Sequence, residues 1–310
     1  MIHKKRVFRG MGTLITIEVV HDAPDSILDE AQKQAQLFEM RFSANDPKSI
    51  LGQVNQQAGK AAVQVPADLF QLIDLARQHS LPSDSYLNIA IGPLVQEWRI
   101  GFADANVPSA EKINALLPLT DPQHIFLNHQ QQTVALAKGM QLDLGAVAKG
   151  FFADQLMGYF KQVGVAAALI DLGGNVMVYG DAPMHEDHLW RIGIQNPFLP
   201  RGNFAAAIKL RNKSVVTSGI YERTLNESGK TYHHIFDRQT GYPLASEIAS
   251  LTIVSEKSVD GEIWTTRLFG QSPQKILSIL ATLTDITGII ITKQGELLYP
   301  REAADLIETV

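Results

Sequence analysis

The sequence predicts an α+β protein with mixed or antiparallel sheets flanked by helices. Two observations support this: segments with helical spacing of apolar residues occupy the front of the chain, and many short apolar strands follow in its middle. Helices and strands come in runs rather than in strict βαβ alternation, which argues against a parallel sheet. The 310 residues contain no repeat, low-complexity tract or recognisable linker. We therefore expect a single domain over residues 1–310, with two lobes sharing a cleft as the alternative.

Apolar periodicity, caps and turn residues predict the elements in order. We expect helices at 25–41, from 66 to about 79, in a short segment ending near Trp98, at 107–119 with Ser109 as N-cap, and at 149–163, 260–268 and 273–283. We expect strands at 7–20, 124–127, 133–136, 166–172 with a continuation at 176–179, 190–194, 204–210, 214–218, 233–236 and 250–254, and a strand pair within 288–298. Residues 43–55 are expected to form a polar loop.

The composition excludes several classes of function. The net charge is −5, so the basic surface typical of proteins that bind nucleic acid or anionic lipid is missing, and phosphate has to be bound by local groups. The absence of cysteine excludes disulfides, thiolate zinc sites, cysteine nucleophiles and a lipid-modified cysteine. No apolar run approaches the ~18 residues of a membrane span, and no signal-peptide core follows the basic N-terminus. We expect a cytoplasmic protein without membrane or nucleic-acid partners.

Residues 142–150, Leu-Asp-Leu-Gly-Ala-Val-Ala-Lys-Gly, are the most informative segment. Small residues allow a backbone to approach a phosphorylated ligand closely. Asp143 can accept hydrogen bonds at such a site, and Lys149 can neutralise a phosphate. The alternative is a tight strand-to-helix turn with one salt bridge.

Two later segments carry further chemistry. Glu262 and Thr266 are four residues apart on a predicted helix and share one face, which gives an oxygen-only site of the kind that Mg²⁺ prefers. The alternative is a helix N-terminus whose macrodipole favours acidic residues. His233 and His234 point to opposite faces of a strand, so they cannot easily share one ion. His234 can assist proton transfer because an ordinary histidine pKa lies near neutrality, and a structural role is the alternative.

In combination these segments resemble the ApbE family of flavin transferases. The resemblance extends from about Phe8 to Leu283 and rests on motifs that occur in the family's order. The motifs are Met-Gly-Thr at 11–13, Ser…Ser-x-Leu…Asn at 43–55, Gly-Pro-Leu-Val…Trp at 92–98, the 142–150 segment with an aspartate beyond it, Gly-Gly-Asn at 173–175, Thr-Ser-Gly-x-Tyr-Glu-Arg at 217–223, His-His-Ile-x-Asp…Thr-Gly at 233–241, and Thr-x-Leu-Phe at 266–269.

The resemblance implies an ApbE-like fold with a central nucleotide cleft that binds FAD and Mg²⁺. It implies that the metal takes the backbone oxygen of Ala146, the Glu262 carboxylate and the Thr266 hydroxyl. The residues implied around the nucleotide are Met11, Asn45, Asn88, Ile89, Ala90, Asp143, Lys149, His234, Phe236 and Thr265. The implied reaction moves FMN from FAD to a threonine hydroxyl of an acceptor flavoprotein and leaves AMP. Lys149 adds positive charge in this reaction, and His234 or Asp237 is the base.

The chain departs from the family pattern at several of these positions. Glu262 stands where aspartate is usual, so the metal lies farther from the helix or the side chain folds back, and Asp260 is the fallback ligand. Asn45 replaces a common tyrosine, and residues 88–90 are Asn-Ile-Ala where Asp-x-Thr is common. Two alternatives follow from these changes: hydrolysis of FAD to FMN and AMP, with water in place of threonine, and a non-catalytic FAD-binding module.

Overall fold

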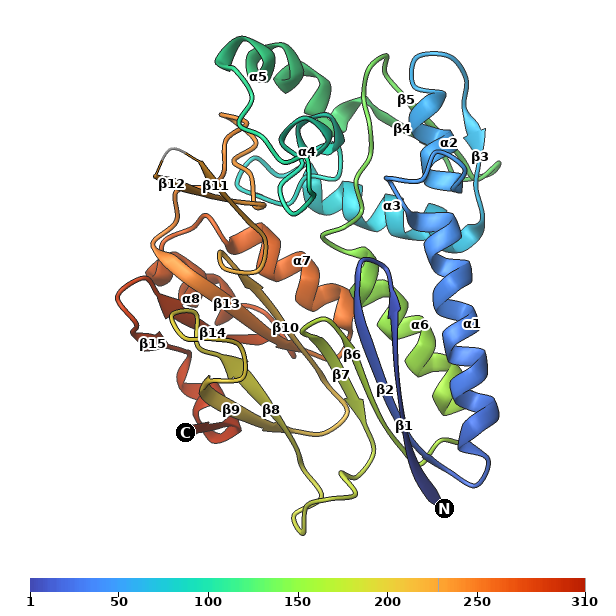
Figure 1. Ribbon diagram of the computed structural model, residues 1–310, viewed down its shortest axis with the longest axis vertical. Helices are drawn as coiled ribbons and strands as arrows, with labels where there is room; N and C mark the ends of the chain where they lie inside the picture. Colours follow the sequence, from blue (N-terminus) through green and yellow to red (C-terminus); the bar gives the residue numbers. More distant parts are fainter. Residues whose placement is uncertain (228, 310) are drawn as a thin grey trace.

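An eight-stranded antiparallel sheet forms the centre of the computed structural model, which describes residues 1–227 and 229–309 (Figure 1). In spatial order its strands are β1 (Ile2–Gly10), β2 (Thr13–His21), β6 (Ala167–Leu172), β7 (Asn175–Tyr179), β10 (Ser214–Gly219), β13 (Ile248–Ser255), β14 (Thr287–Thr292) and β15 (Leu297–Leu298). Smaller sheets pair β16 (Ile307–Thr309), β9 (Phe204–Leu210) and β8 (Trp190–Gln195); β3 (Val63–Gln64), β5 (Thr133–Leu136) and β4 (Ile125–Asn128); and β11 (Thr224–Glu227) with β12 (Lys230–His233).

Four of the eight helices described below pack on one face of the central sheet, and a small sheet covers the other. The helices are α1 (Pro24–Phe42), α2 (Ile50–Gln56), α3 (Ala67–Ser80), α4 (Gly92–Trp98), α5 (Ala110–Leu116), α6 (Ala148–Gln162), α7 (Ser258–Leu268) and α8 (Pro273–Leu280). In Figure 1, α1 and α6 lie beside β1, β2 and β6, whereas α7 and α8 lie against β10, β13 and β14. The sheet of β8, β9 and β16 packs on the opposite face through an apolar cluster that contains Ile192, Ile208 and Val254. This architecture confirms the prediction of an α+β fold with antiparallel sheets and flanking helices.

One apolar core connects the front of the chain to the late helix α7. The same buried cluster contains Ile17 of β2, Leu28 of α1, Ile73 of α3, Phe152 of α6 and Ile263 of α7. Residues on the facing sides of α6 and α7 are therefore held by packing rather than by loops. None of the described helices is long and apolar enough to cross a lipid bilayer.

Two expected continuous strands are hairpins, and the prediction was wrong at both places. The expected strand 7–20 is β1 and β2, with Met11 (φ 50°) and Gly12 (φ 71°) at the turn between them. The expected continuation from 166–172 into 176–179 is the antiparallel pair β6 and β7, which turns at Gly173 (φ 71°) and Gly174 (φ 95°). Left-handed backbone at both central positions gives the tight turn that matches the twist of paired strands.

Two further expectations needed correction. The expected polar loop 43–55 contains most of α2, because Ser49 caps this helix by accepting the Gly52 N–H at 2.8 Å. The expected strand 233–236 ends at His233, and beyond it only Phe236 forms an isolated bridge with Pro243. The predicted cap at Ser109 is confirmed, since its hydroxyl accepts the Lys112 N–H.

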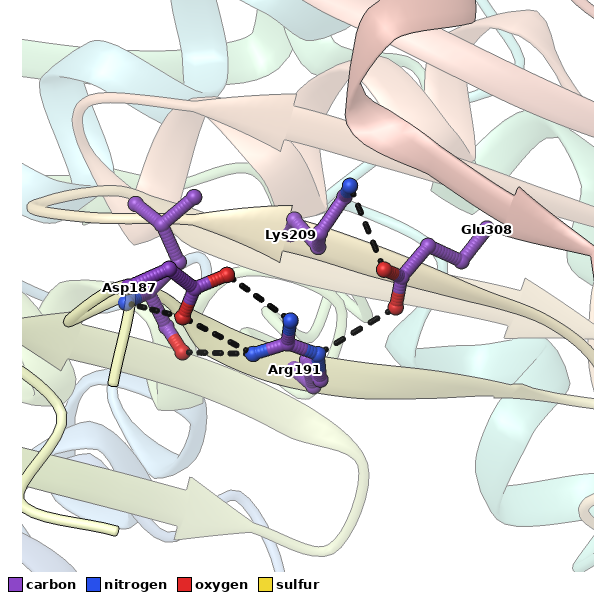
Figure 2. Close-up of polar contacts among 5 residues, drawn as sticks. Asp187, Arg191, Lys209 and Glu308 are labelled. Carbon is purple, nitrogen blue, oxygen red and sulfur yellow. Dashed lines mark hydrogen bonds and ion pairs between the residues drawn. The ribbon is translucent and has the colours of Figure 1, made fainter. Parts of the chain in front are cut away.

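An ion-pair network ties the last strand to the small outer sheet. Figure 2 shows Arg191 of β8 between Asp187 and Glu308, with Lys209 of β9 on the other side of Glu308. The Arg191 guanidinium lies 2.8 Å from Asp187 and 3.3 Å from Glu308, and the Lys209 ammonium lies 3.2 Å from Glu308. Partly exposed pairs stabilise a protein weakly one by one, so we attribute to this network mainly the placement of β16 beside β9.

Candidate active site

Two predicted site segments meet where α6 begins against α7. The Lys149 ammonium donates to Oε1 of Glu262 at 2.8 Å, and the Gly150 N–H donates to Oε2 at 2.8 Å. Glu262 is only 3% exposed, and 112 residues separate it from Gly150. A Cβ atom at position 150 would lie 2.5 Å from the Ser258 carbonyl oxygen, so glycine is required for this close helix contact. The salt bridge expected for a purely structural strand-to-helix turn is therefore present. It lies between Lys149 and Glu262, the same charged residues that the resemblance assigns to phosphate and metal binding.

Asp154, one turn further along α6, fixes the start of α7. Its carboxylate accepts the backbone N–H groups of Ser258 and Val259 at 2.7 Å and 2.9 Å. Burial raises the pKa of Asp154 to about 6, the two backbone hydrogen bonds oppose this rise, and the nearby charges of Asp260 and Glu262 add to it. This contact sets the position of the helix that presents Glu262.

The turn before α6 is held by neighbouring segments. The Asn55 side chain donates to the Leu142 carbonyl at 3.0 Å and accepts the Leu142 N–H at 2.7 Å. The Asp143 N–H donates to the Ile89 carbonyl at 2.9 Å, and the Asp143 carboxylate accepts the Gly145 N–H at 2.7 Å. Burial raises the pKa of Asp143, while the Gly145 hydrogen bond and the charge of Arg223 lower it.

The two adjacent histidines have different environments, although His234 lies beyond the end of β12 rather than on a strand. His233 is buried; its Nε2 lies 2.9 Å from the Leu244 carbonyl and its Nδ1 accepts the Ile235 N–H at 3.3 Å. In contrast, Nδ1 of His234 is buried and lacks a hydrogen-bond partner among the described residues. Burial lowers the pKa of His234 to about 4, with further lowering by Arg223, His233 and Lys149 and an opposing hydrogen bond with the Arg223 backbone. The imidazole is therefore neutral near pH 7.

Arg223 is a site residue that the sequence reasoning did not single out. Its charge acts on both Asp143 and His234, and the charge of Lys149 also acts on His234. Four segments thus bring ionisable groups together around the α6 N-terminus. The only sequence signal for Arg223 is its position as the last residue of the Thr-Ser-Gly-Ile-Tyr-Glu-Arg motif.

Residues 88–90 are buried beside the turn that precedes α6. Asn88 is buried; its amide donates to the Thr120 carbonyl at 2.8 Å and its oxygen accepts the Ala90 N–H at 2.9 Å. Ile89 and Ala90 are fully buried, and the Ile89 carbonyl is the acceptor for Asp143 described above. Contact of these three residues with a nucleotide stays a prediction, and only Ile89 among them is bonded to Asp143.

Met11 lies at the β1–β2 turn, and Asn45 lies in the segment between α1 and α2. Met11 is half-buried at the β1–β2 turn, packed against the main core. Asn45 is exposed, and its oxygen accepts a hydrogen bond from the Gln96 side chain of α4 at 2.9 Å. A direct role of either residue in binding FAD stays a prediction.

Three other predicted residues are occupied by local contacts. Phe236 is buried, with its ring centroid 5.9 Å from that of Trp98. Thr265 is fully buried and its hydroxyl donates to the Glu262 carbonyl at 3.1 Å. The Asp237 carboxylate accepts the Gln239 N–H at 2.8 Å within its own turn. These contacts fit structural roles, and roles in binding or catalysis stay predictions.

The residues predicted to bind a metal fit a hard divalent cation by their chemistry. They offer one carboxylate, one hydroxyl and one backbone carbonyl, and magnesium prefers such oxygen ligands. Ala146 and Thr266 are half-buried, and the buried Glu262 carboxylate already holds the positive charge of Lys149. Among the described residues, no group of three or more histidine, aspartate or glutamate side chains is placed to hold a metal. The fallback ligand Asp260 is half-buried, and burial raises its pKa.

The fold and site define an α+β protein in which acidic and basic side chains gather where α6 begins against α7. A sequence model of the ApbE family matches residues 11–290, and the chain belongs to that family. An FAD:protein FMN transferase from Klebsiella pneumoniae (strain 342) is 40% identical over 290 residues, which are 93% of this chain and 89% of that protein. A second, from Treponema pallidum (strain Nichols), is 34% identical over 297 residues, 91% of this chain and 82% of that protein.

Solved structures support the same fold. The ApbE protein from Thermotoga maritima has a TM-score of 0.88 at 24% identity, covering 98% of this chain and 99% of that chain. The apo flavinyl transferase ApbE from Pseudomonas stutzeri has a TM-score of 0.82 at 24% identity, covering 98% and 97%. The predicted ApbE-like fold is thereby confirmed.

Proposed function

We propose that this protein transfers FMN from FAD to a threonine hydroxyl of an acceptor flavoprotein and releases AMP, with Mg²⁺ held by Ala146, Glu262 and Thr266. The observation that carries the proposal is the direct contact of Glu262 with Lys149 and Gly150. It joins the two segments on which a shared diphosphate and metal site depends. The curated relatives named as FAD:protein FMN transferases support the flavin-transfer activity.

The charges of the site suit cleavage of a diphosphate. Lys149 and Arg223 supply positive charge for phosphate oxygens, whose negative charge grows as the phosphorus–oxygen bond to AMP breaks. Mg²⁺, when bound, supplies Lewis-acid stabilisation of the same oxygens. The hydrogen bond of the Asp143 N–H to the Ile89 carbonyl supports a role of the Asp143 carboxylate in orienting polar groups of the nucleotide.

His234 is the better candidate for the general base. Its Nδ1 is without a partner among the described residues, and the neutral ring can accept the proton of the attacking threonine hydroxyl. The lowered pKa makes it a weak base in the free protein, and a bound diphosphate dianion nearby would raise that pKa. The Asp237 carboxylate, in contrast, is engaged by the Gln239 N–H.

The test is an incubation of the protein with FAD, Mg²⁺ and a panel of flavoproteins that carry a surface threonine. We expect one FMN mass to be added to an acceptor, removal of the adduct by Thr→Ala substitution in that acceptor, and release of AMP in equal amount. Absence of an adduct across the panel contradicts the proposal. Steady release of FMN and AMP without acceptor identifies hydrolysis instead, and intact FAD with bound flavin identifies the non-catalytic module.

A further inference from the structure

We infer that the Lys149 ammonium neutralises Glu262 while no divalent metal is bound. When the metal binds to Glu262, the ammonium moves to the FAD diphosphate. This makes Lys149 a positioning residue whose movement couples the binding of metal and nucleotide. The inference rests on the proposed function, because it takes Glu262 as the metal ligand. It adds to that function a sequence of steps: the Lys149–Glu262 ion pair of the free protein opens, and each of the two side chains then takes a new partner.

The environment of Glu262 requires a positive partner. Its side chain is 3% exposed and both carboxylate oxygens are engaged, one by the Lys149 ammonium and one by the Gly150 N–H. A buried carboxylate without a compensating charge is strongly destabilising. The backbone bond to Gly150 holds the carboxylate in place whichever cation is present. The cation bound to Oε1 of Glu262 is therefore the part of this arrangement that can change.

Lys149 is the mobile member of the pair. Its side chain is 29% exposed, and it joins α6 through a flexible four-carbon stem, so its ammonium can leave without movement of either helix. A metal ion on Glu262 and an ammonium 2.8 Å from the same carboxylate would repel each other strongly. Binding of the metal at Glu262 thus favours release of Lys149.

The released ammonium gains a new partner when FAD is bound. We expect the anionic oxygens of the diphosphate to lie where the charges of Arg223 and Lys149 both act on His234. FAD therefore removes the competitor of the metal, and the metal frees the lysine for FAD. Linkage requires this coupling to be equal in both directions.

The test measures Mn²⁺ affinity by electron paramagnetic resonance of the free ion, first without FAD. Lys149→Met should bind Mn²⁺ at least about tenfold more tightly than the wild type, because the competitor is gone. Lys149→Arg should bind more weakly than the wild type, because a guanidinium pairs with a carboxylate through two donors. The matched control is Lys257→Met. Lys257 is exposed, and its charge acts on Asp260 near the start of α7, so this substitution removes an equal charge without removing a contact of Glu262.

Three results overturn the inference. They are an unchanged or weaker Mn²⁺ affinity in Lys149→Met, equal gains in Lys149→Met and Lys257→Met, and no difference between Lys149→Arg and the wild type. The arginine variant keeps the test decisive if the methionine variant does not fold. With FAD present, the gain in Mn²⁺ affinity on adding FAD should be smaller in Lys149→Met than in the wild type. Failure of the wild type to bind Mn²⁺ even with FAD would instead contradict the proposed metal site itself.

Discussion

Asp154 of α6 accepts the backbone N–H of Ser258, the first residue of α7, at 2.7 Å. The first N–H groups of a helix lack partners within it, and residue Lys257 at the N-cap makes no side-chain cap bond. A carboxylate from a neighbouring helix thus does the work of a local cap. The helix that presents Glu262 and Thr266 is positioned by the helix that begins with Lys149, so the two halves of the site cannot shift independently.

The first prediction concerns this cap. Asp154→Ala should lower the free energy of unfolding by about 1–2 kcal/mol, because two N–H groups of α7 lose their acceptor. Guanidinium unfolding at pH 7.5 measures the change. The control is Glu256→Ala, an exposed acidic residue two positions before Ser258, which should change stability by less than about 0.5 kcal/mol. Equal losses in both variants would show that Asp154 acts only through general charge.

The second prediction concerns the metal ligands. Thr266→Ala should lower Mg²⁺-dependent flavin transfer at least about 100-fold, because the diphosphate loses its organised cation. Glu262→Gln should have the same effect while its amide oxygen keeps an acceptor for the Gly150 N–H. Adduct formation at saturating Mg²⁺ measures the loss, and thermal unfolding confirms that both variants fold. Full turnover in both variants would remove these residues from the metal site.

The observed ion pair changes the choice of variant at position 262. Glu262→Ala would be the simplest test if Glu262 only lined a cleft, since such a residue is easily truncated. In the structure the alanine variant would leave a buried N–H group and a lysine without their partner. An unpaired buried N–H group alone costs about 1–3 kcal/mol, so a loss of activity in Glu262→Ala would not separate metal binding from stability.

Long amphipathic segments were predictable because their periodicity persists over several turns. The expected helices 25–41 and 149–163 differ from α1 and α6 by one residue at each end. The β1–β2 turn was not, because Met11 carries no mark of left-handed backbone and the flanking strands alternate without a break. Gly173 and Gly174, in contrast, are a recognised hairpin signal that the prediction of a continuous strand did not use. Short strands such as β3 and β16 depend on pairing partners elsewhere in the chain, which periodicity cannot reveal.

The sequence indicated the two segments that form the site, but it did not indicate the contacts between them. Small residues in 142–150 and the Glu262–Thr266 spacing each suggested local chemistry, but no local pattern tells that Gly150 lies against Ser258. For the same reason the sequence assigned Lys149 to a phosphate, although in the free protein its partner is Glu262. Long-range partners such as Asn55 for Leu142 become visible only when the core has brought the segments together.

The third prediction concerns nucleotide affinity with metal bound. At saturating Mg²⁺ and without an acceptor protein, Lys149→Ala should weaken FAD binding by about 10- to 100-fold, because a charge-assisted bond contributes roughly 1.5–3 kcal/mol. Quenching of flavin fluorescence measures the dissociation constant. Lys161→Ala is the comparison, since Lys161 lies in the last turn of the same helix, over the Tyr179 ring. Equal FAD affinity in the wild type and Lys149→Ala would limit Lys149 to its bond with Glu262.

The last prediction uses the pH dependence of stability. Burial lowers the pKa of His234 from 6.5 to about 4, so the unfolded chain binds a proton on this residue before the folded protein does. Its stabilising contribution is therefore complete above pH 6.5 and is lost as the pH falls towards 4. When the pH falls from 7.5 to 5, the free energy of unfolding of the wild type should decrease on the order of 1–2 kcal/mol more than that of His234→Gln. Asp154 contributes in the opposite sense, since its raised pKa favours the folded state at acidic pH, but it is present in both proteins and cancels in the comparison. Parallel pH profiles of the two proteins would show that His234 is solvated and has an ordinary pKa, and would remove the physical basis for its role as a neutral base.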